Sequence, residues 1–227
     1  MCPVQIKKLL IIRPKIVTDD WTMYTFEASA HFKKDAEEKY GWVVKELDTD
    51  FANRGEVEDY LQNEMPNLVI HYGHGWPDRL WGQSNRQKES VLSSAVGEDN
   101  VNLLSSTSVS TVSCSSALWL GKRAVEVNTR NQKTYYLGYD FPIYCSYDSV
   151  EYLKYYERSA NAANDALIAG KTFQEAWKIG YDKYTEEYNN LLALKDPYVD
   201  AFVAPLLLLN RDHFKLFESI RGPTLWF

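Results

Sequence analysis

The sequence predicts an α/β protein whose parallel sheet is covered by helices on both faces. Short apolar runs alternate with helical segments over roughly the first 75 residues, the β-α-β-α-β order typical of a parallel sheet. These runs are uniformly apolar, as expected of strands buried on both faces. Because no repeat, linker or break in composition divides the 227 residues, we expect a single domain over 1–227.

The first half of the chain supplies three predicted strands and two predicted helices. Pro14 ends the first strand, because proline lacks the amide hydrogen that a sheet ladder needs. Asp19 and Asp20 are suited to cap the first helix, and Gly41 is suited to end it. The predicted elements are strands at 4–13, 42–47 and 68–72 and helices at 20–40 and 56–61.

The second half begins with residues 76–106, which are polar and lack periodicity. We expect this segment to be a functional loop region over the site, with a small hairpin near 80–82 and a short segment at 101–104. Further along, Thr172 and Glu175 form a capping-box pattern. The remaining predicted elements are strands at 109–113 and 133–139, helices at 117–127, 149–169 and 172–193, and two strands within 205–217.

Composition restricts the class of partner. The formal net charge is −6 and no long run of Lys or Arg is present, which argues against nucleic acid or an anionic membrane as the main partner. The most apolar runs, 9–12 and 206–209, are too short to span a bilayer. The N-terminal residues lack the order and length of a secretory signal, so a cytoplasmic protein is expected if the sequence is the whole chain.

Cysteine usage agrees with a reducing compartment. Cys2, Cys114 and Cys145 are widely spaced and odd in number, so they suggest neither a disulfide framework nor a Cys-x-x-Cys metal site. The chain also lacks a glycine-rich phosphate-binding loop. We therefore expect neither a metal nor a cofactor.

Two predicted strands end in residues that carry chemistry. His74 follows the 68–72 strand and lies between Gly73 and Gly75, which permit a sharp turn. Cys114 follows the 109–113 strand and precedes a predicted helix, whose N-terminus favours a thiolate. Ligands of open parallel sheets bind at the carboxyl ends of the strands. A histidine base and a cysteine nucleophile at these ends predict a thiol hydrolase.

Alternatives to this pairing remain open at this point. A cysteine or histidine at a strand end is more often structural, and only the pairing favours catalysis. A metal site from His71, His74 and Cys114 would lack a clear fourth ligand, and His71 should point to the other side of its strand. A different amidohydrolase could pair Cys114 with His213. A phosphatase loop is excluded, because Leu120 stands where its arginine is needed.

The two strand ends resemble the signature of the caspase-like superfamily of cysteine peptidases, which includes caspases, legumains, gingipains, separases and CHAT-domain proteases. Residues 69–75 followed by Trp81 are most similar to the gingipain form, and residues 113–116 are closer to separase and CHAT proteins. Residues 138–143 resemble the CHAT strand after the catalytic cysteine, with Phe141 where those proteins usually have Trp. The resemblance covers roughly residues 4–180.

The resemblance implies a three-layer caspase-like fold with a mostly parallel sheet of about six strands between helices. It implies a cysteine endopeptidase that forms an acyl-enzyme intermediate. His74 would be the general base and acid, Cys114 the nucleophile, and the backbone N–H groups of Gly75 and Cys114 the oxyanion hole. A catalytically silent binding or scaffold module of the same fold is the alternative.

The resemblance also implies a protein or peptide substrate. Gingipains, separases and many CHAT enzymes place an acid in the specificity pocket and cut after Arg or Lys. Asp140 and Asp148 are the acids best placed for that role, and we expect Trp76 and Trp81 to contribute to substrate binding. We further expect control by a regulatory partner chain or by opening of residues 76–106.

Overall fold

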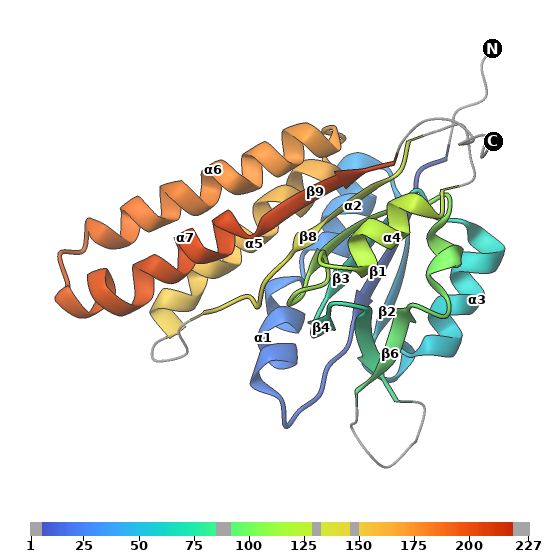
Figure 1. Ribbon diagram of the computed structural model, residues 1–227, viewed down its shortest axis with the longest axis horizontal. Coiled ribbons are helices and arrows are strands. Elements are labelled where there is room, and N and C mark those ends of the chain that lie inside the picture. Colours follow the sequence, from blue (N-terminus) through green and yellow to red (C-terminus); the bar gives the residue numbers. More distant parts are fainter. Residues whose placement is uncertain (1–5, 85–91, 129–132, 146–149, 220–227) are drawn as a thin grey trace.

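The structure is a computed structural model that describes residues 6–84, 92–128, 133–145 and 150–219. Its central feature is a six-stranded sheet with the order β2-β1-β3-β7-β8-β9 (Figure 1). The first five strands run parallel, and β9 pairs with β8 in the antiparallel sense. The strands are β1 (Lys8–Arg13), β2 (Val43–Asp48), β3 (Leu68–Tyr72), β7 (Ser108–Val112), β8 (Tyr135–Tyr139) and β9 (Phe214–Glu218). The predicted mostly parallel sheet is thus confirmed.

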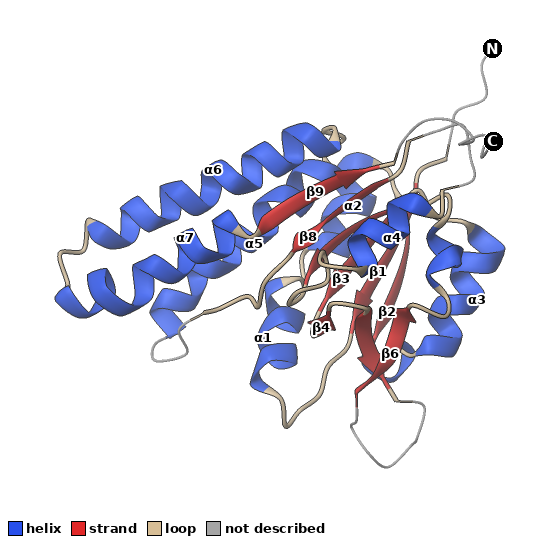
Figure 2. Cartoon of the chain, in the orientation of Figure 1, coloured by secondary structure: helices blue, strands red, loops and turns tan. Residues whose placement is uncertain are grey.

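Helices cover both faces of this sheet and give three layers (Figure 2). One face packs against α1 (Asp20–Ala28), α2 (Phe32–Tyr40), α5 (Val150–Ile168), α6 (Phe173–Leu192) and α7 (Ala204–Asp212). The other face packs against α3 (Arg54–Glu64) and α4 (Leu120–Glu126). In the described parts of the chain, the longest helices carry too many polar residues to cross a lipid bilayer.

The strand side chains alternate between these two layers. In β3, Leu68, Ile70 and Tyr72 join the core under α5, whereas Val69 joins the core under α3 and α4. All five β3 residues are buried, as the uniformly apolar pattern predicts. The alternation matters for the site, because it determines the layer that each residue near a strand end faces.

The described part of 76–106 has more regular structure than the predicted loop region, and β5 lies where the small hairpin was predicted near 80–82. Three antiparallel strands form a second small sheet: β4 (Gly75–Trp76), β5 (Arg79–Gln83) and β6 (Leu92–Gly97). Leu80, Ala95 and Val96 are fully buried against the α3 layer, and this packing stabilises the small sheet. The short segment expected at 101–104 is a 3-10 helix, Val101–Leu104.

Two further predicted elements need correction. The single helix predicted for 20–40 is two helices, because Ser29 ends α1 and α2 begins at Phe32. The first strand predicted within 205–217 is helix α7, whereas the second is β9. Pro205 stands in the first turn of α7, where a helix tolerates proline, and a short leucine run does not distinguish strand from helix.

Candidate active site

The two predicted catalytic segments lie side by side at one edge of the sheet. Strands β3 and β7 are neighbours, and Tyr72 is paired with Val112 at the last rung of their ladder. His74 and Cys114 each lie two residues beyond that rung. Gly73 continues the contact, since its N–H donates to the Val112 carbonyl at 3.3 Å.

Gly75 fits tightly against the cysteine turn. A Cβ atom at Gly75 would lie 2.7 Å from the Cys114 carbonyl oxygen and 2.8 Å from the Ser113 Oγ atom. Any larger residue would therefore push the two strand ends apart. Glycine at this position allows the backbone beside His74 to touch the backbone of Cys114.

Asp19 holds the His74 ring. Its Oδ2 atom lies 2.6 Å from His74 Nε2, while its Oδ1 atom accepts from the N–H groups of Trp21 and Thr22 at 3.0 and 3.3 Å. One carboxylate thus caps α1 and orients the histidine, and Figure 1 shows α1 beside β4 at this end of the sheet. With Nε2 engaged, Nδ1 is the ring nitrogen available to a thiol.

Asp19 is a candidate site residue that sequence reasoning missed. The sequence predicted it as a helix cap, and the structure confirms that role. Its contact with His74 joins residues 55 positions apart, so no local pattern signals it. The Trp21 indole also reaches this turn, donating from Nε1 to the Gly73 carbonyl at 2.9 Å.

Cys114 is half-buried, and the Ile143 N–H donates to its Sγ atom at 3.4 Å. Burial raises the pKa of the Cys114 thiol, while backbone hydrogen bonds to the sulfur act in the opposite direction. The raised pKa favours the neutral thiol, which needs a base before it can attack.

The cysteine turn is held by β8 rather than by a helix. Ser115 has a left-handed φ of 54°, and the N–H groups of Ser115 and Ala117 donate to Phe141 and Tyr139 carbonyls. Helix α4 begins at Leu120, three residues later than the start of the helix predicted at 117–127 and six residues after Cys114. Its dipole cannot be credited with stabilising a thiolate, because that effect falls off within the first turn.

The backbone at Gly75 is compatible with an oxyanion hole. The Trp81 N–H donates to the His74 carbonyl at 3.1 Å, and Gly75 is paired with Leu80. Hydrogen-bonded and non-hydrogen-bonded pairs alternate along an antiparallel ladder. The Gly75 N–H therefore points away from β5, and its role with the Cys114 N–H stays a prediction.

His71 faces the opposite layer from His74. It is fully buried, its Nε2 donates to the Trp81 carbonyl at 2.8 Å, and its Nδ1 accepts from the Thr111 hydroxyl at 3.1 Å. Burial lowers the pKa of His71 to about 4. Both nitrogens are occupied, which argues against the three-residue metal alternative. Among the residues that the structure describes, no group of three or more His, Cys, Asp or Glu side chains could hold a metal ion.

A second His–Asp pair lies at the same sheet edge. His213 Nδ1 is 2.7 Å from Asp140 Oδ1, and the His213 ring stacks on Phe141 with centroids 4.5 Å apart. Lys215 Nζ lies 3.8 Å from Asp140 Oδ2. The carboxylate expected to line a specificity pocket is thus already engaged by two cationic or titratable neighbours.

The remaining predicted substrate-binding residues differ in exposure. Trp76, on β4, is 60% exposed and directly follows the His74 turn. Trp81, on β5, is half-buried, and its indole Nε1 is buried without a hydrogen-bond partner. Asp148 lies outside the described residues, so its predicted role stays a prediction.

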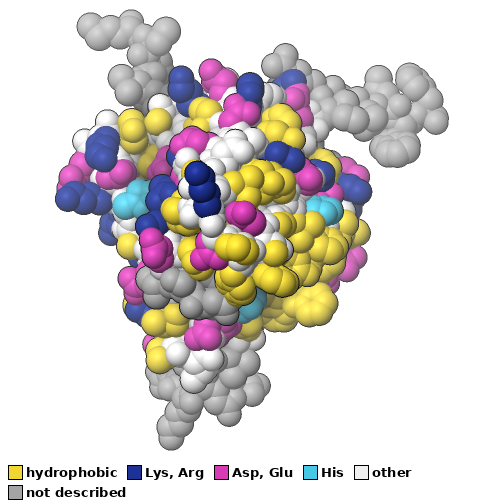
Figure 3. Space-filling view, turned by 90° about the vertical axis from the view of Figure 1, so that its left-hand side faces the viewer, with side chains coloured by type: hydrophobic (Ala, Val, Ile, Leu, Met, Phe, Trp, Pro, Cys, Tyr) yellow, Lys and Arg dark blue, Asp and Glu magenta, His cyan; other side chains and the backbone are white. Residues whose placement is uncertain are grey.

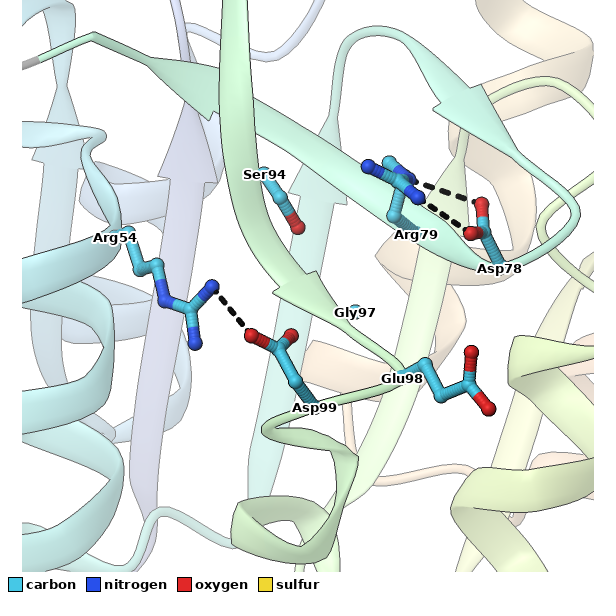
Figure 4. Close-up of a pocket in the computed structure, with 7 residues that line it drawn as sticks. All are labelled: Arg54, Asp78, Arg79, Ser94, Gly97, Glu98 and Asp99. Carbon is cyan, nitrogen blue, oxygen red and sulfur yellow. Dashed lines mark hydrogen bonds and ion pairs between the residues drawn. The ribbon is translucent and has the colours of Figure 1, made fainter.

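Two pockets lie away from the His74–Cys114 edge. A polar pocket of about 340 Å³ opens between α3 and the small sheet, and Figure 4 shows Arg54 turned toward Asp99 and Arg79 turned toward Asp78. Each arginine is neutralised by that partner, at 2.8 and 2.5 Å. A pocket of about 540 Å³ lies along α6 and β9 and includes Trp177. Neither pocket is lined by His74 or Cys114.

A large apolar surface is also present. Figure 3 shows hydrophobic side chains gathered where α6 ends and α7 begins. The large apolar residues that are exposed in that connection are Leu194, Tyr198 and Phe202.

Comparison with other proteins does not identify a family. Neither the protein-family models nor the curated proteins contain a match to this sequence.

Proposed function

We propose that the protein is a cysteine endopeptidase in which Cys114 is the nucleophile, His74 the general base and acid, and Asp19 the residue that orients His74. The observation that supports this most strongly is the His74–Asp19 pair beside the Cys114 turn. A nucleophile, a base at the adjacent strand end and a half-buried acid behind the base together form the arrangement of a catalytic triad.

The steps follow from these positions. His74 Nδ1 takes the proton of the Cys114 thiol, and the thiolate attacks the carbonyl carbon of the scissile peptide bond. Asp19 stabilises the imidazolium that forms. The Gly75 and Cys114 N–H groups bind the oxyanion of the tetrahedral intermediate. His74 then gives its proton to the leaving amine, which leaves a thioester, and a water that His74 deprotonates hydrolyses the thioester.

Cleavage after Arg or Lys is the specificity that we propose, with Asp140 as the acid. Because Asp140 contacts His213 and Lys215, a basic substrate side chain must replace or share these neighbours. Trp76 offers an exposed aromatic surface next to the base. Aromatic rings of this kind pack against apolar and cationic side chains alike.

One observation favours a catalytically silent module as the second candidate. Cys114 is half-buried, and the backbone of Ile143 lies directly against its sulfur. If the backbone at Ile143 stays in this position, it occupies space beside the sulfur that a bound substrate needs. The two candidates differ in a single property, which is the reaction of Cys114 with a peptide electrophile.

The decisive experiment is cleavage of a positional peptide library by the wild-type protein, by Cys114→Ala and by Cys145→Ala. Cys145 is the matched control, because it is also half-buried. We expect cleavage by wild type and Cys145→Ala and none by Cys114→Ala. Equal cleavage by all three would reject the proposal.

If none of the three proteins cleaves the library, each is labelled with a peptide chloromethyl ketone at neutral pH. Labelling confined to Cys114 and dependent on His74 would support the peptidase mechanism with an activator still to be supplied. A Cys114 that reacts no faster than a denatured thiol would establish the silent module.

A further inference from the structure

The segment after β8 is held between the nucleophile and helix α7. On one side, the Ile143 N–H donates to the Cys114 sulfur at 3.4 Å. On the other side, Asn210 near the end of α7 contacts the next residue, Tyr144. The segment therefore links a core helix to the reactive sulfur.

Asn210 binds both backbone groups of one residue. Its Oδ1 accepts from the Tyr144 N–H at 2.9 Å, and its Nδ2 donates to the Tyr144 carbonyl at 2.7 Å. Asn210 is itself only 2% exposed, so neither bond competes freely with water. A bidentate contact of this kind fixes the two peptide units on either side of the Tyr144 Cα atom. The Ile143 N–H lies in the next peptide unit, which is joined to them through the φ and ψ angles of Ile143.

We propose that Asn210 is a positioning residue for the nucleophile, because its grip on Tyr144 keeps the Ile143 N–H aimed at the Cys114 sulfur. A catalytic role for Asn210 rests on the proposed peptidase function, whereas the effect of Asn210 on the Cys114 sulfur does not. A hydrogen bond to a charged acceptor favours the charged form. The aligned N–H thus makes the thiolate easier to form at a site where burial disfavours it.

Other titratable groups at this sheet edge are left in place by changes at Asn210. His74 and Asp19 approach from β3 and α1, and Asp140, His213 and Lys215 approach from β8 and β9. None of these side chains has a described hydrogen bond to Asn210. A change in thiol titration caused by Asn210→Ala would therefore report on the backbone contact.

The test is the pH dependence of Cys114 alkylation by iodoacetamide. The intact, folded protein is alkylated, and the labelled fraction of Cys114 is then measured by mass spectrometry after digestion. Wild type, Asn210→Ala and Asn100→Ala are compared. Asn100 is the matched control: it is a buried asparagine that follows β6, accepts from the Gly97 N–H at 2.7 Å and donates to the Ala95 carbonyl at 3.1 Å.

We expect the alkylation midpoint of Asn210→Ala to rise by about one pH unit, since a hydrogen bond to a charged group is worth roughly that shift. Asn100→Ala should keep the wild-type midpoint. A midpoint in folded Asn210→Ala at or below the wild-type value would overturn the proposal.

A second variant covers the case in which Asn210→Ala does not fold. Ile143→Pro removes the N–H donor and leaves the Asn210 contacts with Tyr144 intact. The same upward shift is expected, and an unchanged midpoint overturns the proposal. Because alkylation needs no peptide substrate, a shift in a protein that neither cleaves peptides nor reacts with the chloromethyl ketone would retain the role of Asn210 and reject the peptidase. Cleavage without a shift would do the reverse.

Discussion

The Cys114 turn lies between two hydrogen-bonded His–Asp pairs of nearly equal N–O distance, although His74 uses its Nε2 atom and His213 its Nδ1 atom. In one pair, His74 is 2.6 Å from Asp19, and in the other, His213 is 2.7 Å from Asp140. Both histidines are about one-third exposed at the side chain. On distance and exposure alone, either pair could serve a thiol nucleophile.

Their neighbours differ. His74 follows β3, which is hydrogen-bonded to the cysteine strand β7, whereas β9 is separated from β7 by β8, about 10 Å away at ordinary strand spacing. Asp19 is fixed as a helix cap, but Asp140 shares its charge with Lys215. Two features thus make His74 the better candidate base. It follows the strand next to the cysteine strand, and its aspartate is held in place as a helix cap.

The largest expected effect comes from removing each histidine in turn. His74→Ala should lower kcat/KM by about 10³-fold, within the range for loss of a general base, and His213→Ala should change it by less than about tenfold. Peptide cleavage with the best library substrate measures both. The opposite ranking would support the alternative amidohydrolase, with His213 as its base.

The acids can be compared with a change that spares the fold. Asp19→Asn should lower kcat/KM by about 10²-fold, because an amide cannot stabilise an imidazolium. Asparagine is as good a helix cap as aspartate, so thermal unfolding should be unchanged. If the unfolding temperature of Asp19→Asn also falls, so that partial unfolding accounts for the lost activity, the orienting role is contradicted.

His71, the third histidine near the edge, shows what burial without a carboxylate does. Its pKa is about 4 in the folded state, below the ordinary 6.5. As pH falls below about 6.5, only the unfolded chain takes up this proton, so stability is lost by about 2 kcal/mol between pH 7 and pH 5. Urea unfolding of wild type and His71→Gln checks this, and the stability difference between them should shrink as pH falls. A constant difference would mean that His71 is not held neutral.

The smallest expected effect concerns the second pair as a specificity element. Asp140→Asn should reduce cleavage after Arg and Lys by about tenfold relative to cleavage after other residues, the scale of one partly screened charge contact. Selectivity in the peptide library measures this ratio. An unchanged ratio would assign the His213–Asp140 pair to structure alone.

The sequence by itself determined the layered α/β fold and the two strand ends that carry His74 and Cys114. Apolar strands buried on both faces, and the helix signals between them, are local patterns that few other structures satisfy. Local patterns also explain the errors. Residues 92–97 are strand β6 because Val96 packs against the α3 layer, and α7 forms where a four-leucine run allowed either structure.

Only the tertiary structure decided the partners of these residues. Asp19 reaches His74 across 55 positions, and Asn210 reaches Tyr144 across 66, because α1 and α7 pack with their ends at the edge where β3, β7 and β8 finish. The sequence around a helix cap or a buried asparagine does not reveal which distant residue its side chain contacts. Which backbone or ring it meets depends on how the helices pack on the sheet, and that packing is a property of the whole core.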